Sequence, residues 1–335
     1  MPRLLFLTQS GPTLPSVRFR VLPFVEGARA AGVDAAWRRY PKTALGRALF
    51  FAGLRRTPVV VLQKKLVSPL ELALLRRKAG RLVFDFDDAL WAAHPGQGAL
   101  GGGAVPGELE RLLRVCAGVD EVVAGNTFLA EKVRTSARRV TVLPTPLDTD
   151  RYVPAGAARR SGGLPVVGWM GTSCNLFFLP PLFDALAPLA GQVRLSVVSD
   201  GRIDLPAGLA GECERWTPQT EIPALQALDI GLMPLTDDEY TRGKCGFKLL
   251  QYMACGAVPV ASDVGFNREI ITHGRDGFLA GDTADFGRYV ADLVRDPAMR
   301  ARMAARARAK VVERFGLDAA LRRLWPVLGL EGLPE

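Results

Sequence analysis

Residues 244–262 read KCGFKLLQYMACGAVPVAS, and this stretch indicates how the chain is built. Leu250 and Ala254 are apolar at helical spacing, and Gly256 is suited to end that helix. Residues 257–261 then form a short apolar run of the strand type. The stretch therefore predicts a loop, a short helix and a buried strand in succession.

Lys248 lies in the first turn of this predicted helix. The helix dipole disfavours a cation at that end. The position makes sense if an anion lies between the ammonium group and the free backbone N–H groups. Gln251, three residues on, shares the same face. The sequence thus predicts an anion site, and the alternative is a lysine whose stem merely runs along the helix to solvent.

The composition is typical of a globular α/β protein. The 335 residues exceed what one core usually takes, which predicts two domains. Apolar runs are too short to cross a membrane, and residues 4–7 are too few for a signal-peptide core. Five scattered cysteines and two histidines show no metal-ligand spacing, so we expect reduced thiols, no metal and a cytoplasmic protein.

The net charge of +9 bears on the expected partners. A basic balance favours an acidic substrate, a nucleotide or an anionic membrane surface. No recognised nucleic-acid-binding module is present, so we expect no nucleic-acid partner. A peripheral contact with the inner face of a membrane is consistent with this charge.

Strands and helices alternate along both halves, which predicts two parallel sheets with helices on both faces. The expected strands are residues 3–9, 33–40, 59–63, 82–86, 121–124 and 140–143, then 166–170, 194–198, 230–234, 257–261 and 278–280. The expected helices include residues 17–31, 106–116 and 176–190. A linker rich in Pro, Gly and Ser separates two Rossmann-like domains, residues 1–155 and 160–314, with a last helix within 315–330. Such domains face a central cleft and bind ligands at the carboxyl ends of their strands.

Several polar residues follow strands of the N-terminal half. Gly11 allows close approach of a ligand, and Arg18 and Arg20 suit a phosphate or carboxylate, unless they are only solvated. This loop lacks the G-x-G-x-x-G pattern, so no dinucleotide fingerprint is present. Asp85 and Asp87 share one strand face, whereas Asp88 faces away or begins the loop.

Three side chains near the end of this strand are candidates for a catalytic or binding role. Asp87 and Asp88 can orient sugar hydroxyls, act as a general base, bind a metal or cap a turn. His94 can donate a hydrogen bond to a substrate oxygen or be uninvolved.

In the C-terminal half, Gly171 and Thr172 precede a helix, which suits a phosphate but also an ordinary capped helix. Trp216 follows a later strand and can stack on a nucleobase, although a core role is commoner for tryptophan. Residues 237–239 (DDE) are predicted to be a solvated loop.

Residues 243–262, with 274–279 (GRDGFL) after them, resemble the donor region of GT-B retaining glycosyltransferases of the large group 1 (family 4) class. The typical motif there is Glu-Gly-Phe-Gly-x-x-x-x-Glu-Ala-Met-Ala-Cys-Gly-x-Pro-Val-x-Ala-Ser. Residues 84–91 (FDFDDALW), 126–129 (NTFL) and 142–148 (VLPTPLD) look like a subgroup of these enzymes.

This chain departs from that motif at two acidic positions. Gln251 aligns with the glutamate that holds the nucleotide ribose, and Gly243 with the glutamate that contacts the transferred sugar. The usual lysine after the first strand of the second domain is also absent. Lys244 or Arg242 is therefore expected to supply the second phosphate-binding charge.

The resemblance implies transfer of a sugar from a nucleoside diphosphate to an acceptor hydroxyl, with retention of configuration and without metal or other cofactor. The acceptor is unknown, and the basic charge suggests a lipid-linked or anionic one. The last helix is expected to pack back on the first domain. Expected catalytic residues are Lys248, His94 and Asp87. The donor side is expected to comprise Gly11, Gly171, Thr172, Trp216, Lys244, Lys248, Leu249 and Gln251, and the acceptor side Arg18, Arg20, Asp88 and Trp91.

Two other functions fit the same sequence. A nucleotide-sugar epimerase shares this architecture and would form product from the sugar nucleotide alone. A non-catalytic nucleotide-sugar-binding protein is suggested by the loss of both acidic positions.

Overall fold

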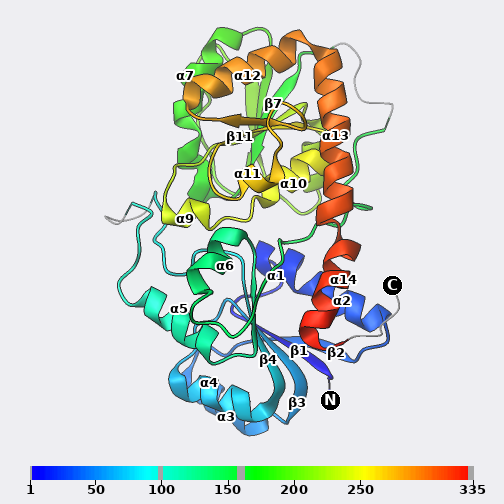
Figure 1. The fold of residues 1–335 in the computed structure, drawn as a ribbon. Helices are drawn as coiled ribbons and strands as arrows, with labels where there is room; N and C mark the ends of the chain where they lie inside the picture. Colours follow the sequence, from blue (N-terminus) through cyan, green and yellow to red (C-terminus); the bar gives the residue numbers. More distant parts are fainter. Residues whose placement is uncertain (1, 97–100, 157–162, 331–335) are drawn as a thin grey trace.

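A computed structural model describes residues 2–96, 101–156 and 163–330, which form two α/β domains joined end to end (Figure 1). Residues 97–100 of the expected glycine-rich loop and 157–162 of the expected linker lie outside the described residues. Each domain is built on a six-stranded parallel sheet, in the orders β2-β1-β3-β4-β5-β6 and β12-β11-β10-β7-β8-β9. The prediction of two Rossmann-like domains is therefore confirmed.

The strands are short and mostly buried, as expected for parallel sheets covered on both faces. Those of the first sheet are β1 (Leu4–Thr8), β2 (Ala35–Arg39), β3 (Thr57–Gln63), β4 (Ala79–Phe86), β5 (Glu121–Ala124) and β6 (Val140–Val142). Those of the second sheet are β7 (Val166–Met170), β8 (Arg194–Ser199), β9 (Gly211–Arg215), β10 (Ile230–Met233), β11 (Val258–Ser262) and β12 (Phe278–Ala280).

Helices cover both faces of the sheets. In the N-terminal domain they are α1 (Pro15–Arg20), α2 (Leu22–Ala30), α3 (Ala44–Gly53), α4 (Pro69–Lys78), α5 (Glu108–Ala117) and α6 (Thr127–Val133). The C-terminal domain holds the 3₁₀ segments η1 (Ser173–Phe178) and η2 (Ala187–Leu189), and α7 (Pro180–Leu186), α8 (Glu221–Ala227), α9 (Glu239–Arg242), α10 (Phe247–Ala254), α11 (Asn267–Ile270), α12 (Thr283–Arg295) and α13 (Pro297–Phe315). The last helix is α14 (Leu317–Leu328).

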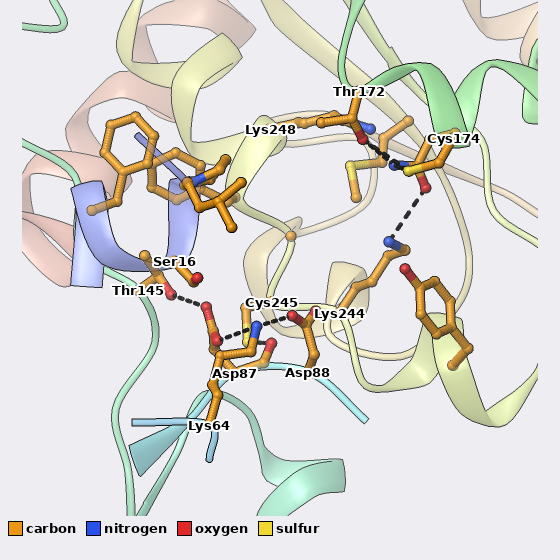
Figure 2. A pocket seen from close by; sticks show the side chains of 18 residues that line it. Ser16, Lys64, Asp87, Asp88, Thr145, Thr172, Cys174, Lys244, Cys245 and Lys248 are labelled. Carbon is orange, nitrogen blue, oxygen red and sulfur yellow. Dashed lines mark hydrogen bonds and ion pairs between the residues drawn. The ribbon is translucent and has the colours of Figure 1, made fainter. Parts of the chain in front are cut away.

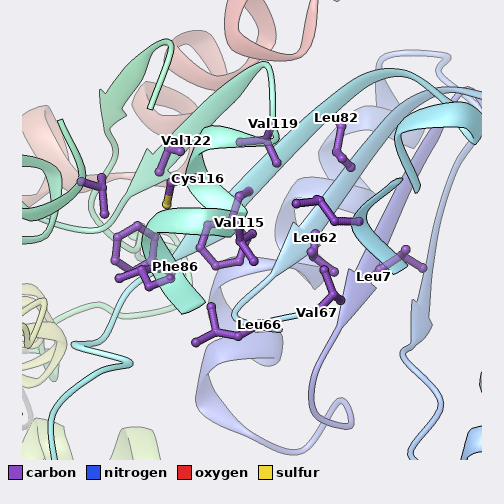
Figure 3. Packing of buried hydrophobic residues seen from close by; sticks show 14 of the residues in the cluster. Leu7, Leu62, Leu66, Val67, Leu82, Phe86, Val115, Cys116, Val119 and Val122 are labelled. Atoms are coloured by element: carbon purple, nitrogen blue, oxygen red, sulfur yellow. The ribbon is translucent and has the colours of Figure 1, made fainter. Parts of the chain in front are cut away.

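The core of the first domain forms where side chains of its strands meet the helices on one face of the sheet (Figure 3). Leu62 of β3 and Phe86 of β4 are fully buried there with Val115 of α5. The polar residues that follow these buried strands therefore lie at one edge of the sheet. That edge faces the second domain.

Helix α14 returns the chain to the N-terminal domain (Figure 1). Its Leu324 and Trp325 are buried in one cluster with Leu4 and Phe6 of β1. Gly316 also forms a bridge to Leu147, at the point where the chain first leaves the N-terminal domain. Two chain crossings therefore hold the domains together.

Two helices that were predicted to be continuous are interrupted. The helix expected over residues 17–31 is broken at Val21, where φ and ψ are −120° and −55°, and α2 restarts there with Pro23 in its first turn. Proline lacks the N–H that would continue the preceding helix. The helix expected over residues 176–190 is divided into η1, α7 and η2 for the same reason, since Pro180 is the first residue of α7 and Pro188 the second residue of η2.

Three short elements differ from the prediction. β9 is an edge strand with charged, partly exposed side chains, so it lacks the apolar run that marks the inner strands. α9 and α11 have four residues each, which is too short for a helical period to be visible. Residues 237–239 were expected to form a solvated loop, but Glu239 is the first residue of α9. That prediction is therefore wrong for Glu239.

Residues 244–262 fold as predicted, into a loop, a short helix and a buried strand. α10 begins after Gly246, whose φ of 60° lies in the left-handed region that favours glycine. A Cβ at Gly246 would also clash with Ile270. Gly256, with φ of 86°, ends the helix before β11. Lys248 thus lies in the first turn of α10, at the carboxyl edge of the second sheet.

Candidate functional site

A pocket of about 310 Å³ lies between the two domains and is lined by both. Figure 2 shows its polar side chains converging from opposite sides. The lining residues are Leu14, Pro15, Ser16, Phe19, Lys64, Asp87, Asp88 and Thr145 from the N-terminal domain, and Thr172, Cys174, Asn175, Met233, Tyr240, Lys244, Cys245, Gly246, Phe247 and Lys248 from the C-terminal domain. Of the residues predicted from the sequence, the structure brings Lys244, Lys248, Thr172, Asp87 and Asp88 together here.

Two lysines form the cationic wall of this pocket. The Nζ of Lys248 lies over the ring of Trp169 at 4.5 Å, and that of Lys244 over the ring of Tyr240, also at 4.5 Å. Lys244 donates a long hydrogen bond of 3.5 Å to Asn175 Oδ1. Within the described residues, neither ammonium group is joined to a carboxylate in an ion pair.

The pKa values of both lysines are lowered. Burial lowers the pKa of Lys248 to about 7, and the neighbouring charge of Lys244 adds to this effect. Burial likewise lowers the pKa of Lys244, although Asp88 opposes it. Two half-buried cations that repel each other are the electrostatic signature of a site for an anion.

Gly171 makes the close approach of Lys248 possible. A Cβ on Gly171 would lie 2.7 Å from Cε of Lys248 and 2.6 Å from the indole of Trp169. Thr172, the next residue, lines the pocket and accepts a hydrogen bond of 2.8 Å from Asn175 Nδ2. The loop after β7 therefore shapes the space above the first turn of α10.

The facing wall carries a lysine between two carboxylates. Lys64 Nζ lies 3.0 Å from Asp87 Oδ1 and also pairs with Asp88 (Figure 2). Lys64 has φ of 60°, the one left-handed φ among the described non-glycine residues. Such strain is often stored at functional sites. Burial would raise the pKa of Asp87, but Lys64 and Arg20 outweigh it and hold that pKa below its usual value.

Arg20 does not line the pocket, which corrects its expected place on the acceptor side. Its side chain is fully buried beneath the pocket, where Nε donates to both carboxylate oxygens of Asp85 at 2.9 and 3.0 Å and Nη2 lies 2.8 Å from Asp85 Oδ1 in the same ion pair. Nη1 donates to the carbonyl of Leu143 at 2.7 Å. Burial would lower the pKa of Arg20, but Asp85 and Asp87 outweigh it and hold it above its usual value. Arg20 therefore has a structural role beneath β4.

Trp91 is corrected in the same way. It is fully buried, and its indole N–H donates to Glu239 of α9 in the other domain. Lys132 of α6 pairs with the same carboxylate at 2.8 Å. Glu239 therefore ties the two domains together rather than lying in a solvated loop.

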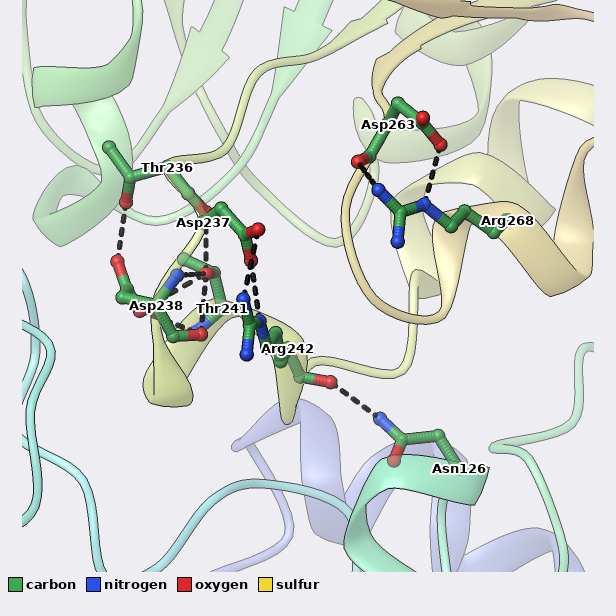
Figure 4. A network of polar contacts seen from close by, with 8 residues as sticks. All are labelled: Asn126, Thr236, Asp237, Asp238, Thr241, Arg242, Asp263 and Arg268. Carbon is green, nitrogen blue, oxygen red and sulfur yellow. Dashed lines mark hydrogen bonds and ion pairs between the residues drawn. The ribbon is translucent and has the colours of Figure 1, made fainter. Parts of the chain in front are cut away.

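Polar contacts surround α9, and the bond from Asn126 to Arg242 joins the two domains there (Figure 4). Asn126, the N-cap of α6, donates from Nδ2 to the carbonyls of Arg242 at 3.2 Å and Lys244 at 3.0 Å. Asp238 caps α9, and Asp237 pairs with Arg242 at 2.6 Å. The loop that bears Lys244 is thus held by the N-terminal domain.

Gly243 lies at this contact and has no space for a side chain. A Cβ there would lie 2.5 Å from the Cβ of Ala89 and 2.7 Å from its backbone nitrogen, both in the N-terminal domain. A glutamate side chain therefore does not fit at this position unless Ala89 moves. The acidic groups nearest in the sequence, Asp238 and Glu239, are already engaged.

Arg18, Trp216 and Gln251 meet at a buried carboxylate instead of in the pocket. Glu221, at the start of α8, accepts two hydrogen bonds from Arg18 at 2.7 and 3.1 Å. It also accepts from Trp216 Nε1 at 3.1 Å, from the Tyr152 hydroxyl and from Gln251 Nε2 at 3.5 Å. Arg18 and Glu221 are 203 residues apart and join the two domains beside the pocket.

Three predicted residues remain. His94 packs against Tyr240 with ring centres 4.9 Å apart, at the side of the pocket near Lys244. Burial and Lys244 lower its pKa, although Asn175 and Asp238 partly oppose them. Leu249 is fully buried in the core, and Gly11 is not among the lining residues.

Sequence reasoning missed Lys64, Asn175, Tyr240 and Glu221. Lys64 directly follows a buried strand, so the rule that placed Asp87 at a strand end would also have found it. Glu221 gave no signal, because Arg18, Tyr152 and Gln251 are distant from it in the sequence. In the parts of the chain that the structure describes, no group of three or more His, Cys, Asp or Glu side chains is placed to hold a metal. No helix in those parts has the length and apolar character needed to cross a membrane.

Comparison with known proteins finds a family similarity in the second domain. Residues 165–296 match the family model of group 1 glycosyl transferases. A stretch of 99 residues is 32% identical to N-acetyl-alpha-D-glucosaminyl L-malate synthase of Bacillus anthracis. That match spans 29% of this chain and 25% of the relative's length.

Solved structures resemble the whole chain. HepE of Anabaena in complex with UDP-glucose superposes with a TM-score of 0.72 at 16% identity, over 97% of this chain and 99% of that one. Sucrose-phosphate synthase of Thermosynechococcus elongatus gives 0.73 at 14% identity, over 97% and 98%. At these identities the likeness concerns the fold. The second domain is therefore similar in sequence to group 1 glycosyl transferases, and the chain as a whole has the two-domain GT-B fold of these solved structures.

Proposed function

We propose that this protein transfers a sugar from a nucleoside diphosphate to an acceptor hydroxyl. The observation that carries the proposal is the pair of unneutralised lysines, Lys244 and Lys248, at the start of α10 in a cleft between two domains. A diphosphate supplies the negative charge that this wall lacks. The group 1 family match of the domain that bears both lysines supports the same reading.

In this proposal, the donor binds on the C-terminal side of the pocket. Lys248, Lys244 and Thr172, which line the pocket, bind the diphosphate, whereas Gln251 belongs to the cluster around Glu221 outside the pocket. Trp216 adjoins that cluster. Solved relatives of the same fold are complexes with UDP or UDP-glucose, so uridine diphosphate sugars are the first donors to test.

In the reaction, the bond between the anomeric carbon and the diphosphate oxygen breaks, and the acceptor oxygen bonds to that carbon. The acceptor proton passes to the leaving diphosphate. Negative charge grows on the diphosphate as its bond breaks, and the fixed charges of Lys248 and Lys244 stabilise it. Attack on the face that the leaving group occupied gives retention, and these fixed cations make a metal unnecessary.

The acceptor hydroxyl enters from the wall of Lys64, Asp87 and Asp88. Because Lys64 and Arg20 keep the pKa of Asp87 low, Asp87 stays ionised and accepts a hydrogen bond from that hydroxyl. His94 has a lowered pKa and is therefore neutral near pH 7, so it can donate one hydrogen bond to a substrate oxygen without adding charge.

The direct test incubates the purified protein with a panel of nucleotide sugars and hydroxyl acceptors, and follows nucleotide release. We expect acceptor-dependent release, an unchanged rate after chelation of divalent metals, and a product whose anomeric proton keeps the coupling of the donor. Conversion of the donor without acceptor would indicate an epimerase instead. Tight nucleotide binding without turnover across the panel would indicate a binding protein.

A second prediction concerns pH. A bound diphosphate raises the pKa of Lys248 from about 7, so binding above pH 7 takes up a proton. Affinity is therefore greatest below pH 7 and falls by up to about tenfold per pH unit until the pKa of the bound state is passed. Calorimetry with UDP at pH 8, in buffers of different ionisation enthalpy, measures this uptake directly. Equal uptake by the Lys248→Met variant would contradict the assignment to Lys248.

A further inference from the structure

One helix of the N-terminal domain carries an apolar face that the described part of the chain leaves uncovered. Leu45, Ala48, Leu49 and Ala52 of α3 are all exposed and recur at helical spacing along one side of the helix. Leu45 is 71% and Leu49 66% exposed. Burial of side chains like these normally stabilises a fold, so a contiguous exposed row of them marks an interaction surface.

The opposite face of α3 fixes the helix in place. Phe50 and Phe51 contact the ring of buried Tyr40, with ring centres 5.8 and 6.3 Å away. Arg47 pairs with Glu71 of the neighbouring α4 at 2.9 Å. The exposed leucines are therefore presented by an anchored helix. Figure 1 shows α3 beside α4 on the side of the N-terminal domain that is remote from the C-terminal domain.

The same segment is strongly cationic. Residues 38–56, RRYPKTALGRALFFAGLRR, contain six basic residues and no acidic one. Five of the six are exposed, on both sides of α3 in the sequence: Arg38, Arg39, Lys42, Arg55 and Arg56. We call these five residues together with Leu45, Ala48, Leu49 and Ala52 the α3 surface.

We propose that the α3 surface binds the face of an anionic lipid bilayer. Apolar side chains on one side of a helix enter the boundary between headgroups and acyl chains, while flanking Lys and Arg pair with anionic headgroups. Charge favours this occupant over a second copy of the chain, because two such surfaces would oppose five cations with five. The protruding leucines favour it over a nucleic acid, which offers phosphate but no apolar layer.

This contact would leave the pocket accessible. No residue of the α3 surface is among those that line the pocket. A protein held on a bilayer in this way keeps its cleft open to a donor from solution. The proposal is also independent of the transferase proposal, since it concerns different residues and can be tested without turnover.

The test is flotation of the full-length protein with vesicles of phosphatidylglycerol and phosphatidylcholine in equal parts, and with vesicles of phosphatidylcholine alone. We expect binding to the anionic vesicles that weakens as salt rises from about 0.05 to about 0.5 M. The variant Leu45→Gln/Leu49→Gln should bind at least about tenfold more weakly. Arg38→Glu/Arg39→Glu should do the same, since each cation near the surface contributes about fivefold in affinity.

Matched controls lie on α13 of the other domain. Val312→Gln replaces an exposed apolar residue, and Arg302→Glu/Arg306→Glu makes the same charge change at exposed positions. Both should bind as the parent does, and all variants should keep its circular dichroism spectrum and melting temperature. Absence of binding to anionic vesicles, or equal loss in the α13 variants, would overturn the proposal. A lipid-free dimer that dissociates on Leu45→Gln/Leu49→Gln, or tighter binding to RNA than to vesicles that is lost in the same variant, would also overturn it.

Discussion

Replacing Lys248 by alanine is expected to lower turnover by about a hundredfold to a thousandfold. The ammonium group lies in the first turn of α10, above Trp169, and forms no ion pair among the described residues. It is therefore free to meet the charge that grows on a leaving diphosphate. Loss of one such donor typically costs about 3–4 kcal/mol of barrier. Steady-state rates of nucleotide release with saturating donor and acceptor measure the effect.

The pattern of the loss separates catalysis from binding. Charge increases on the diphosphate as its bond breaks, so the alanine variant should lose kcat more than it raises KM. Arg77→Ala, which removes an exposed cation of α4 in the N-terminal domain, is the control and should leave turnover unchanged. A Lys248→Ala variant with near-normal kcat would remove Lys248 from the mechanism.

Replacing Arg20 by methionine is expected to destabilise the N-terminal domain by about 3–5 kcal/mol. Arg20 is fully buried, forms an ion pair with Asp85 in which Nε donates to both carboxylate oxygens, and donates through Nη1 to the Leu143 carbonyl. Its loss leaves the Asp85 carboxylate buried without its cation. The free energy of unfolding, from urea denaturation followed by circular dichroism, measures the cost.

A second substitution distinguishes a broken ion pair from a general packing defect. In Arg20→Met/Asp85→Leu both charges are gone, and buried pairs replaced by apolar residues are often neutral in stability. The double variant should therefore recover most of the loss. Arg114→Met breaks the exposed pair with Glu110 and should cost less than about 1 kcal/mol. If Arg20→Met lowered the free energy of unfolding by no more than Arg114→Met does, Arg20 would not have this structural role.

Local patterns in the sequence were sufficient for most of the fold. The apolar strands and the alternation of strand and helix predicted two parallel sheets, and Gly256 predicted the end of α10. These features depend on neighbours within a few residues, which a single sequence displays. The errors came where proline interrupted a helical pattern, as at Pro23, or where an element was only four residues long, as in α9.

The site was predicted less completely, because side chains near a strand end can turn toward the pocket or away from it. Lys244, Lys248, Thr172, Asp87 and Asp88 do line the pocket. Their neighbours Arg20 and Trp91 are buried in contacts with Asp85 and Glu239. Those partners lie 65 and 148 residues away, and no spacing rule connects them.

By itself, the segment 244–262 determined the short helix, the strand after it and the unusual position of a lysine at the helix start. Only the tertiary structure decided that Gly243 packs against Ala89, that Gln251 lies beside Glu221, and that the helix start faces another domain. The physical reason is one of range. Backbone period and glycine conformation are local, whereas burial and the pairing of charges depend on which distant strands and loops the fold brings together.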